Sequence, residues 1–371
     1  MLTLLQRPAP PSDVLPLFSP EAEGRLERFL PPFQFTSFFS PEDTLLCVLA
    51  AERALQALSN TETHRPGGRQ PGGTASRSAP AAPLRIVELT AGSGLVGLRL
   101  LDLDPGARLL GVDVDPAAPP VAERNARALG VAERARFTQL SVLDPECETL
   151  LAGAPIDVLI CNPPYIPEPP GMPLAVEAGS GADGAAHLRR VAELAGRLRP
   201  RTVALSWCSV GDPVGVTEAM ERAGYRLDAL YAVAIADGEY SGMVQPYLET
   251  LSTAFLDRAP ATRHAMAADG AARFAYVLLA GVWVVGDEVR EASDAGSAAA
   301  AVDGLMRGFA REGLEALREP AMPCEYRAWL LDRWDEIVLR AMLHGPASGR
   351  SAAGDDARDA SPVARQPTEP T

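Results

Sequence analysis

The stretch Ile156-Asp-Val-Leu-Ile-Cys161, followed directly by Asn162-Pro-Pro-Tyr165, decides how this chain folds. The short apolar run with branched side chains predicts a buried strand, which must end where the two prolines begin. Pro163 keeps Asn162 extended, so the Asn162 carboxamide and the Pro163 carbonyl can point to one place beyond the strand. Two adjacent acceptors beside the aromatic face of Tyr165 suit a planar NH2 group. Because Asn-Pro also begins ordinary turns, this interpretation depends on the rest of the sequence.

Two segments upstream provide that context. Residues 84–89 predict another buried strand, which runs into the glycine-containing turn Thr90-Ala-Gly-Ser-Gly-Leu-Val-Gly97. Residues 108–114 predict a third strand and carry Asp113 near their end, about twenty residues after the glycine turn, where an acid receives ribose hydroxyls. Glycine at 92 and 94 lets the backbone approach a ligand closely. Together these features indicate a nucleotide-like cofactor.

The glycine pattern also matches G-x-G-x-x-G, so a nicotinamide enzyme is one alternative. Three features favour S-adenosylmethionine instead. Glu88 lies in the strand just before the turn, where it can meet a cationic ligand, and Asp144 follows the strand predicted over 136–140, where it can accept an adenine amino group. The third feature is the turn at Asn162, which has no role in the hydride transfer that a nicotinamide enzyme would catalyse. S-adenosylmethionine carries a sulfonium, an ammonium, a ribose and an adenine, and this set of acids suits it.

Several motifs at once resemble one family, the class I methyltransferases of the HemK/PrmC type, which methylate glutamine in protein release factors. The matching segments are Val87-Glu-Leu-Thr-Ala-Gly-Ser-Gly94, Gly111-Val-Asp-Val-Asp115, Asn125-Ala-Arg-Ala-Leu-Gly130, Ile160-Cys-Asn-Pro-Pro-Tyr-Ile-Pro167, Gly181-Ala-Asp-Gly184 and, more loosely, Ser40-Pro-Glu-Asp-Thr44. The resemblance covers roughly residues 36 to 236. Two departures from the family are Thr90, where glycine is usual, and the absence of a basic residue before Glu42.

The resemblance implies an α/β fold, a doubly wound seven-stranded mostly parallel sheet of the Rossmann-like type, with helical N- and C-terminal additions. It also implies an enzyme that uses S-adenosyl-L-methionine. The expected cofactor-binding residues are Glu88, Thr90, Ala91, Gly92, Gly94, Asp113, Val114, Asp144 and Asn162. The expected catalytic residues are Asn162, Pro163 and Tyr165. If Tyr165 acts by stacking alone, Tyr165→Phe should be nearly silent.

Composition and periodicity divide the chain into five regions. These are a helical region over 1–58, a flexible linker over 59–82, the methyltransferase domain over 83–286, a helical region over 287–345 and a disordered tail over 346–371. The first region should contain helices near 20–30 and 42–58, and the fourth has an apolar stripe from Leu330 to Ala341. Within the domain, strands are expected near 84–89, 108–114, 136–140, 156–161, 202–208, 227–235 and 274–285. A long connection before the last strand should contain a helix near 244–257.

Composition also excludes several kinds of chemistry. The chain has no lysine, which rules out a P-loop lysine and a Schiff-base lysine. Its five cysteines and four histidines lack ligand spacing, so neither a disulfide framework nor a metal site is expected. No signal sequence or spanning apolar run is apparent, so we expect a cytoplasmic protein without a membrane partner.

The sequence favours an N-methyltransferase that acts on the side-chain amide of a protein glutamine, possibly in a translation factor. One alternative substrate is an exocyclic amino group of RNA or DNA, and another alternative is a non-catalytic scaffold that binds a partner through residues 287–345. A net charge of −14 disfavours nucleic acid, although one group of arginines could form a local basic patch. That group is Arg189, Arg190, Arg197, Arg199 and Arg201. The Asn162 turn argues against a scaffold without activity.

Overall fold

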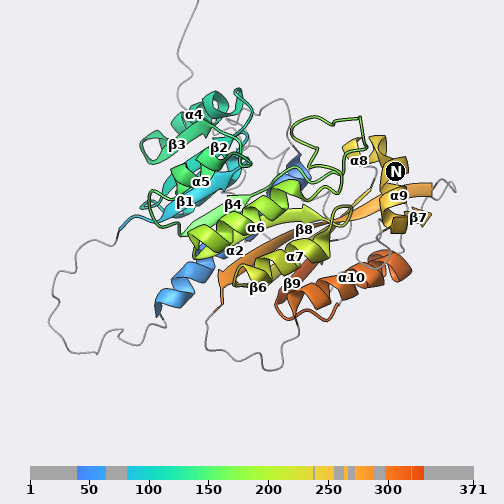
Figure 1. Ribbon diagram of the computed structural model, residues 1–371. Helices are drawn as coiled ribbons and strands as arrows, with labels where there is room; N and C mark the ends of the chain where they lie inside the picture. Colours follow the sequence, from blue (N-terminus) through green and yellow to red (C-terminus); the bar gives the residue numbers. More distant parts are fainter. Residues whose placement is uncertain are drawn as a thin grey trace, which may run out of the picture.

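The computed structural model describes residues 40–63, 82–236, 239–254, 263–265, 272–286, 297–318 and 320–329. These residues form one mixed sheet in the order β3-β2-β1-β4-β5-β8-β6-β9, with β7 paired to β8 (Figure 1). The strands are β1 Arg85–Leu89, β2 Arg108–Asp113, β3 Ala135–Gln139, β4 Val158–Cys161, β5 Thr202–Cys208, β6 Tyr225–Ala236, β7 Arg263–Ala265, β8 Ala272–Val285 and β9 Glu325–Trp329. Only β8 runs antiparallel to its neighbours, which confirms the predicted doubly wound, mostly parallel sheet. The described sheet has nine strands rather than the predicted seven, because β7 and β9 extend it.

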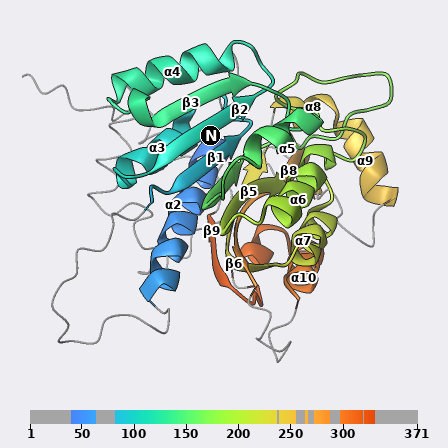
Figure 2. The same ribbon diagram turned by 60° about the vertical axis from the view of Figure 1, so that its left-hand side comes forward.

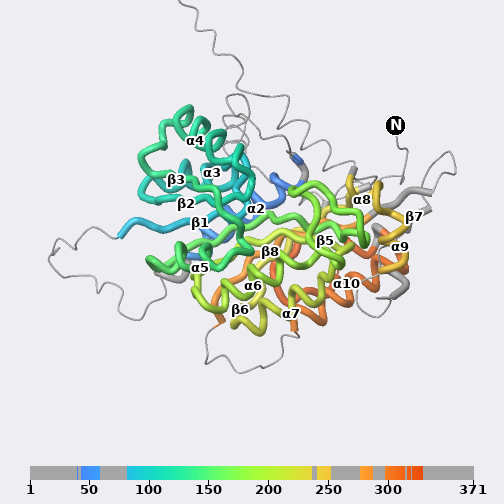
Figure 3. Tube along the Cα trace, turned by 45° about the horizontal axis from the view of Figure 1, so that its top comes forward, coloured from blue at the N-terminus to red at the C-terminus, as the bar shows by residue number. Residues whose placement is uncertain are grey.

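Helices cover both faces of the sheet. The described helices are α2 Pro41–Thr63, α3 Leu95–Leu103, α4 Ala118–Ala128, α5 Pro145–Leu151, α6 Ala186–Leu198, α7 Pro213–Arg222, α8 Glu239–Met243, α9 Gln245–Ala254 and α10 Ala298–Glu312, with short 3-10 helices η1 Ala132–Arg134 and η2 Gly313–Leu317. Helices α2 and α3 pack together on one face, while α6 and α7 lie on the other and α10 packs against α7 (Figures 1 and 2). Helices α8 and α9 lie at the end of the sheet next to β7, far from α4 (Figure 3).

The core is continuous across the sheet. Every residue of β4 and β5 is buried, as their largely apolar sequences predict for strands covered on both faces. Trp207 and Trp283 meet across β5 and β8, with ring centroids 6.1 Å apart. The buried Arg99 of α3 pairs with Glu52 of α2 at 2.7 Å, which fixes the two helices against each other. This packing holds the carboxyl ends of the parallel strands in place.

Strand register brings the predicted site segments together. Leu89 of β1 lies opposite Val112 of β2 and Cys161 of β4. The residues that follow these strands therefore emerge at the same edge of the sheet, where ligands bind in doubly wound folds.

Three expectations about the elements were wrong in part. The region 287–345, expected to be helical, contains α10 and η2 but also strand β9. Tyr326 and Ala328 of β9 pack on the core at alternate positions, and the strand pairs with the edge of β6. Helix α2 continues to Thr63, into the segment expected to be a linker, and two short helices replace the single one expected near 244–257. The helix expected near 20–30, the stripe from Leu330 and the tail over 346–371 lie outside the described residues.

Candidate functional site

The loop after β1 turns sharply through left-handed backbone conformations. Thr90, Gly92 and Gly94 have φ values of 54°, 50° and 76°. Gly94 is the N-cap residue of α3, and a Cβ atom on it would lie 2.9 Å from the ring of Phe137. The backbone N–H of Ala91 donates to the Val112 carbonyl at 2.9 Å, which holds the loop against β2. The loop thus presents backbone rather than side chains to the edge of the sheet.

Asp113 lies beside this loop, as its spacing predicted. One carboxylate oxygen accepts a hydrogen bond from the Gly92 N–H at 2.7 Å, and the other accepts from the Asp115 N–H at 2.9 Å. Burial raises the pKa of Asp113, while these backbone hydrogen bonds oppose the rise. Each oxygen keeps a second lone pair, so the carboxylate can still accept from two hydroxyls.

Glu88 is more deeply buried than a residue open to a ligand would be. Its side chain is 3% exposed, and one oxygen accepts a hydrogen bond from the Gly97 N–H at 3.0 Å in the first turn of α3. A Cβ atom on Gly97 would come within 2.6 Å of that oxygen, so the acid fits only because glycine stands there. Burial raises the pKa of Glu88 to about 8, with a further contribution from the Asp113 charge. A cation nearby would stabilise its ionised form.

Asn162 supplies an unsatisfied acceptor at the end of β4. Among the residues that the structure describes, none donates a hydrogen bond to its side-chain oxygen Oδ1, although that atom is buried. Its backbone carbonyl accepts from the Thr90 hydroxyl at 3.1 Å. A buried acceptor without a partner costs about 1–3 kcal/mol, so an N–H donor from a ligand would be stabilised there.

Tyr165 is held by its hydroxyl group. The ring is 7% exposed, and the hydroxyl donates to the carboxylate of Asp43 in α2. Tyr276 of β8 shares hydrogen bonds with Tyr165 and Ser241. Burial and the Asp43 charge raise the pKa of Tyr165 well above its ordinary value. Because the hydroxyl has this partner, Tyr165→Phe is no longer expected to be silent.

The segment after Tyr165 is fixed by backbone contacts to Glu168. Its carboxylate accepts from the Gly181 N–H at 2.7 Å and from the Leu174 N–H at 3.0 Å. Helices α8 and α9 then brace the same segment (Figure 1): the Tyr240 hydroxyl donates to Glu177 at 2.8 Å, and the Tyr247 hydroxyl donates to the Ala182 carbonyl at 2.9 Å.

Three residues at this edge of the sheet have exposed side chains: Val114, Leu143 and Asp144. Asp144 is the N-cap residue of α5, but its side chain makes no capping hydrogen bond. Val114 is 43% exposed and Leu143 is 46% exposed, so both side chains are open to contact with an apolar ligand. Sequence reasoning missed Leu143, although its place next to Asp144 after a strand was a usable signal.

Asn125, in the motif Asn125-Ala-Arg-Ala-Leu-Gly130, joins α4 to the glycine loop. Its buried amide nitrogen donates to the Ser93 carbonyl at 2.9 Å, which ties α4 to the glycine loop. The sequence did contain a signal for this role, namely a polar asparagine on the buried face of an Ala- and Arg-rich helix.

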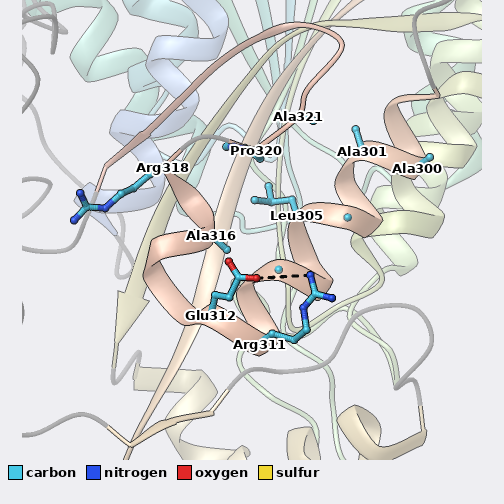
Figure 4. Close-up of a pocket in the computed structure, with 11 residues that line it drawn as sticks. Ala300, Ala301, Leu305, Arg311, Glu312, Ala316, Arg318, Pro320 and Ala321 are labelled. Atoms are coloured by element: carbon cyan, nitrogen blue, oxygen red, sulfur yellow. Dashed lines mark ion pairs between the residues drawn. The ribbon is translucent and has the colours of Figure 1, made fainter.

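The structure also contains a cavity of about 710 Å³ (Figure 4). It is lined by residues of α10, η2 and the turn that follows, including Leu305, Arg311 and Arg318. None of the predicted site residues lines it. In the described part of the chain, no cluster of three or more acids, histidines or cysteines could hold a metal, and no helix is long and apolar enough to cross a membrane.

The residues present fit S-adenosylmethionine. The left-handed glycine loop leaves room for close approach, and the Asp113 carboxylate lies beside it. The buried Glu88 carboxyl group would ionise next to a cation, and Asn162 Oδ1 has no hydrogen-bond donor among the described residues. Fold and edge together define the Rossmann-like architecture of class I methyltransferases.

Comparison with known proteins agrees with the family resemblance, although no family model matches the chain. The chain is similar to release factor glutamine methyltransferases. It is 38% identical to that of Moorella thermoacetica over 133 residues, which are 33% of this chain and 45% of the relative. It is 47% identical to that of Rhodospirillum rubrum over 83 residues, 22% of this chain and 24% of the relative.

A different relative gives a longer match. The 4-amino-L-phenylalanine/4-methylamino-L-phenylalanine methyltransferase of Streptomyces pristinaespiralis is 33% identical over 175 residues, 44% of this chain and 52% of that protein. The chain thus spans about half or less of the length of these curated relatives. Among solved structures, a SAM-dependent methyltransferase from Agrobacterium tumefaciens is 14% identical with a TM-score of 0.36, over 68% of this chain and 66% of that one.

Proposed function

We propose that this protein is an S-adenosylmethionine-dependent N-methyltransferase whose acceptor is the side-chain amide of a glutamine in a protein release factor. The observation that carries the proposal is the buried Asn162 Oδ1 next to the glycine loop, which no described residue provides with a hydrogen-bond donor. Similarity to release factor glutamine methyltransferases supports the choice of acceptor.

Cofactor binding would use the whole edge of the sheet. Asp113 would accept the ribose hydroxyls, Val114 and Leu143 would contact the base, and Asp144 would accept its amino group. Glu88, whose pKa burial raises to about 8, would ionise when the cationic end of the cofactor lies next to it. When bound, S-adenosylmethionine supplies an electrophilic methyl group.

The chain's own part in the reaction is to orient the acceptor nitrogen. An amide nitrogen shares its lone pair with the carbonyl group and is therefore a weak nucleophile. Asn162 Oδ1 and the Pro163 carbonyl would accept its two N–H groups and direct the lone pair at the methyl group. Good orientation can lower the barrier by up to about 7–11 kcal/mol. Both acceptors also stabilise the positive charge that develops on nitrogen. The proton then leaves to water, so no dedicated base is needed.

The charges of the described residues support a protein acceptor over nucleic acid. Arg189 pairs with Asp183 at 2.7 Å, and Arg197 pairs with Glu148 at 2.8 Å. Arg190 also contacts Glu148, at 3.3 Å. Three members of the arginine group are thus already paired with acids, two of them with the same Glu148 carboxylate, in a chain of net charge −14. Phosphate binding needs cations that are free to replace counterions.

A second candidate acceptor is the aromatic amine of a small molecule. The longest match described above is to an enzyme named for 4-amino-L-phenylalanine. An aromatic amine is also a planar NH2 group, so the same two acceptors could orient it. Here the acceptor would have to enter the site as a free small molecule rather than as part of a protein.

Incubation with methyl-labelled S-adenosylmethionine and a panel of acceptors tests the proposal. The panel consists of a purified bacterial release factor, bulk tRNA and 4-amino-L-phenylalanine, each with wild-type protein and Asn162→Ala. We expect label in the release factor, mapped to a glutamine by mass spectrometry, and none with Asn162→Ala. Label in tRNA would show that the acceptor is a nucleic acid rather than a protein glutamine. Label in 4-amino-L-phenylalanine would show that it is an aromatic amine. Donor binding without transfer to any of the three would favour the scaffold.

A further inference from the structure

Thr90 occupies a backbone conformation that its side chain disfavours. Its φ of 54° lies in the left-handed region, where a β-branched residue is an outlier and glycine is unstrained. The backbone on both sides is fixed: Leu89 pairs within the sheet, and the Ala91 N–H donates to Val112 at 2.9 Å. Such strain persists only where the surrounding structure imposes it, and it often marks a functional position. The side chain must therefore supply something that glycine cannot.

The hydroxyl of Thr90 reaches across to β4. Its oxygen lies 3.1 Å from the backbone carbonyl oxygen of Asn162 and 3.6 Å from the sulfur of Cys161. It also lies 2.5 Å from the carbonyl oxygen of Leu89, so the two carbonyl oxygens share its single proton. The contact with Asn162 joins the loop that follows β1 to the turn that follows β4. These are the two segments that would hold the methyl donor and the acceptor.

We propose that Thr90 is a positioning residue, whose hydroxyl fixes the backbone of Asn162 and thereby aims its unsatisfied carboxamide oxygen. This inference rests on the proposed function and deepens it. It also changes the role of Thr90, which the sequence placed among the cofactor-binding residues. Thr90 acts through Asn162, so its loss should impair turnover and leave donor binding intact.

Four proteins test the proposal: wild type, Thr90→Gly, Thr90→Val and Thr90→Ser. Glycine relieves the backbone strain and removes the hydroxyl, so we expect a higher Tm but a kcat lower by about tenfold, the effect of one lost hydrogen bond. Valine keeps the branched shape without the hydroxyl, so kcat should fall similarly with no gain in Tm. Serine restores the hydroxyl and should recover most of kcat. The donor Kd, measured by calorimetry, should stay constant in all four.

The outcomes separate this inference from the proposed function. A wild-type kcat in Thr90→Gly would overturn the positioning role. So would a donor Kd that rises by the same factor as kcat falls. If wild type methylates neither the release factor nor any other acceptor in the panel, the proposed function fails instead. Hydrogen exchange of residues 160–166 then still tests Thr90: exchange should be faster in Thr90→Val than in Thr90→Ser, and equal rates would refute the contact. If the valine variant does not fold, the glycine and serine variants give the same comparison.

Discussion

Removal of the Tyr165 hydroxyl should cost both stability and turnover. The hydroxyl donates to the Asp43 carboxylate from a side chain that is 7% exposed. A hydrogen bond to a charged group contributes about 1.5–3 kcal/mol, and its loss leaves the carboxylate with one donor fewer. We therefore expect Tyr165→Phe to lower the free energy of unfolding by about 1.5–3 kcal/mol. Because this bond anchors the turn that begins at Asn162, kcat should fall as well.

Urea unfolding of four proteins provides the measurement: wild type, Tyr165→Phe, Asp43→Ala and the double variant. A double-mutant cycle isolates the interaction between the two side chains, which should account for most of the loss. Tyr247→Phe is a matched control, since its hydroxyl donates to a neutral carbonyl, that of Ala182, at 2.9 Å. This control should lose only about 0.5–1.5 kcal/mol. A coupling energy near zero, or a Tyr165→Phe protein as stable as wild type, would refute the reasoning.

Three further predictions follow from the same edge of the sheet. Asn162→Ala should abolish methyl transfer with little change in donor Kd, and near-normal turnover would remove Asn162 from the mechanism. Asp113→Ala should fold but bind the donor less tightly by about 1.5–3 kcal/mol for each lost hydrogen bond, which calorimetry measures. Glu88 has a pKa raised from 4.5 to about 8, so the folded protein keeps a proton that the unfolded chain has lost. Its contribution to stability should therefore be complete at low pH and decline as pH rises from 4.5 to about 8. Urea midpoints across this range should fall more for wild type than for Glu88→Gln, and parallel curves would contradict the assignment.

Local sequence signals were sufficient for most of the sheet. All seven predicted strands are present, because a buried parallel strand is a short apolar run bounded by turn residues. The turn at Asn162 and the glycine loop were equally readable, since proline and glycine restrict or extend the backbone where they stand. Strand β9 could not be predicted from the sequence, because its segment follows a helix and has no strong strand pattern of its own. It forms a strand because it pairs with the open edge of β6.

The sequence by itself thus determined which residues lie together at the carboxyl edge of the sheet, because short local patterns predict the strands and the loops that follow them. Only the tertiary structure decided how they are held. Tyr165 and Asp43 are 122 residues apart in the sequence, and nothing in either segment predicts their contact. The strained backbone of Thr90 is likewise set by strands on both sides of it. Contacts between distant segments depend on the packing of the whole sheet, and so they have no local signature.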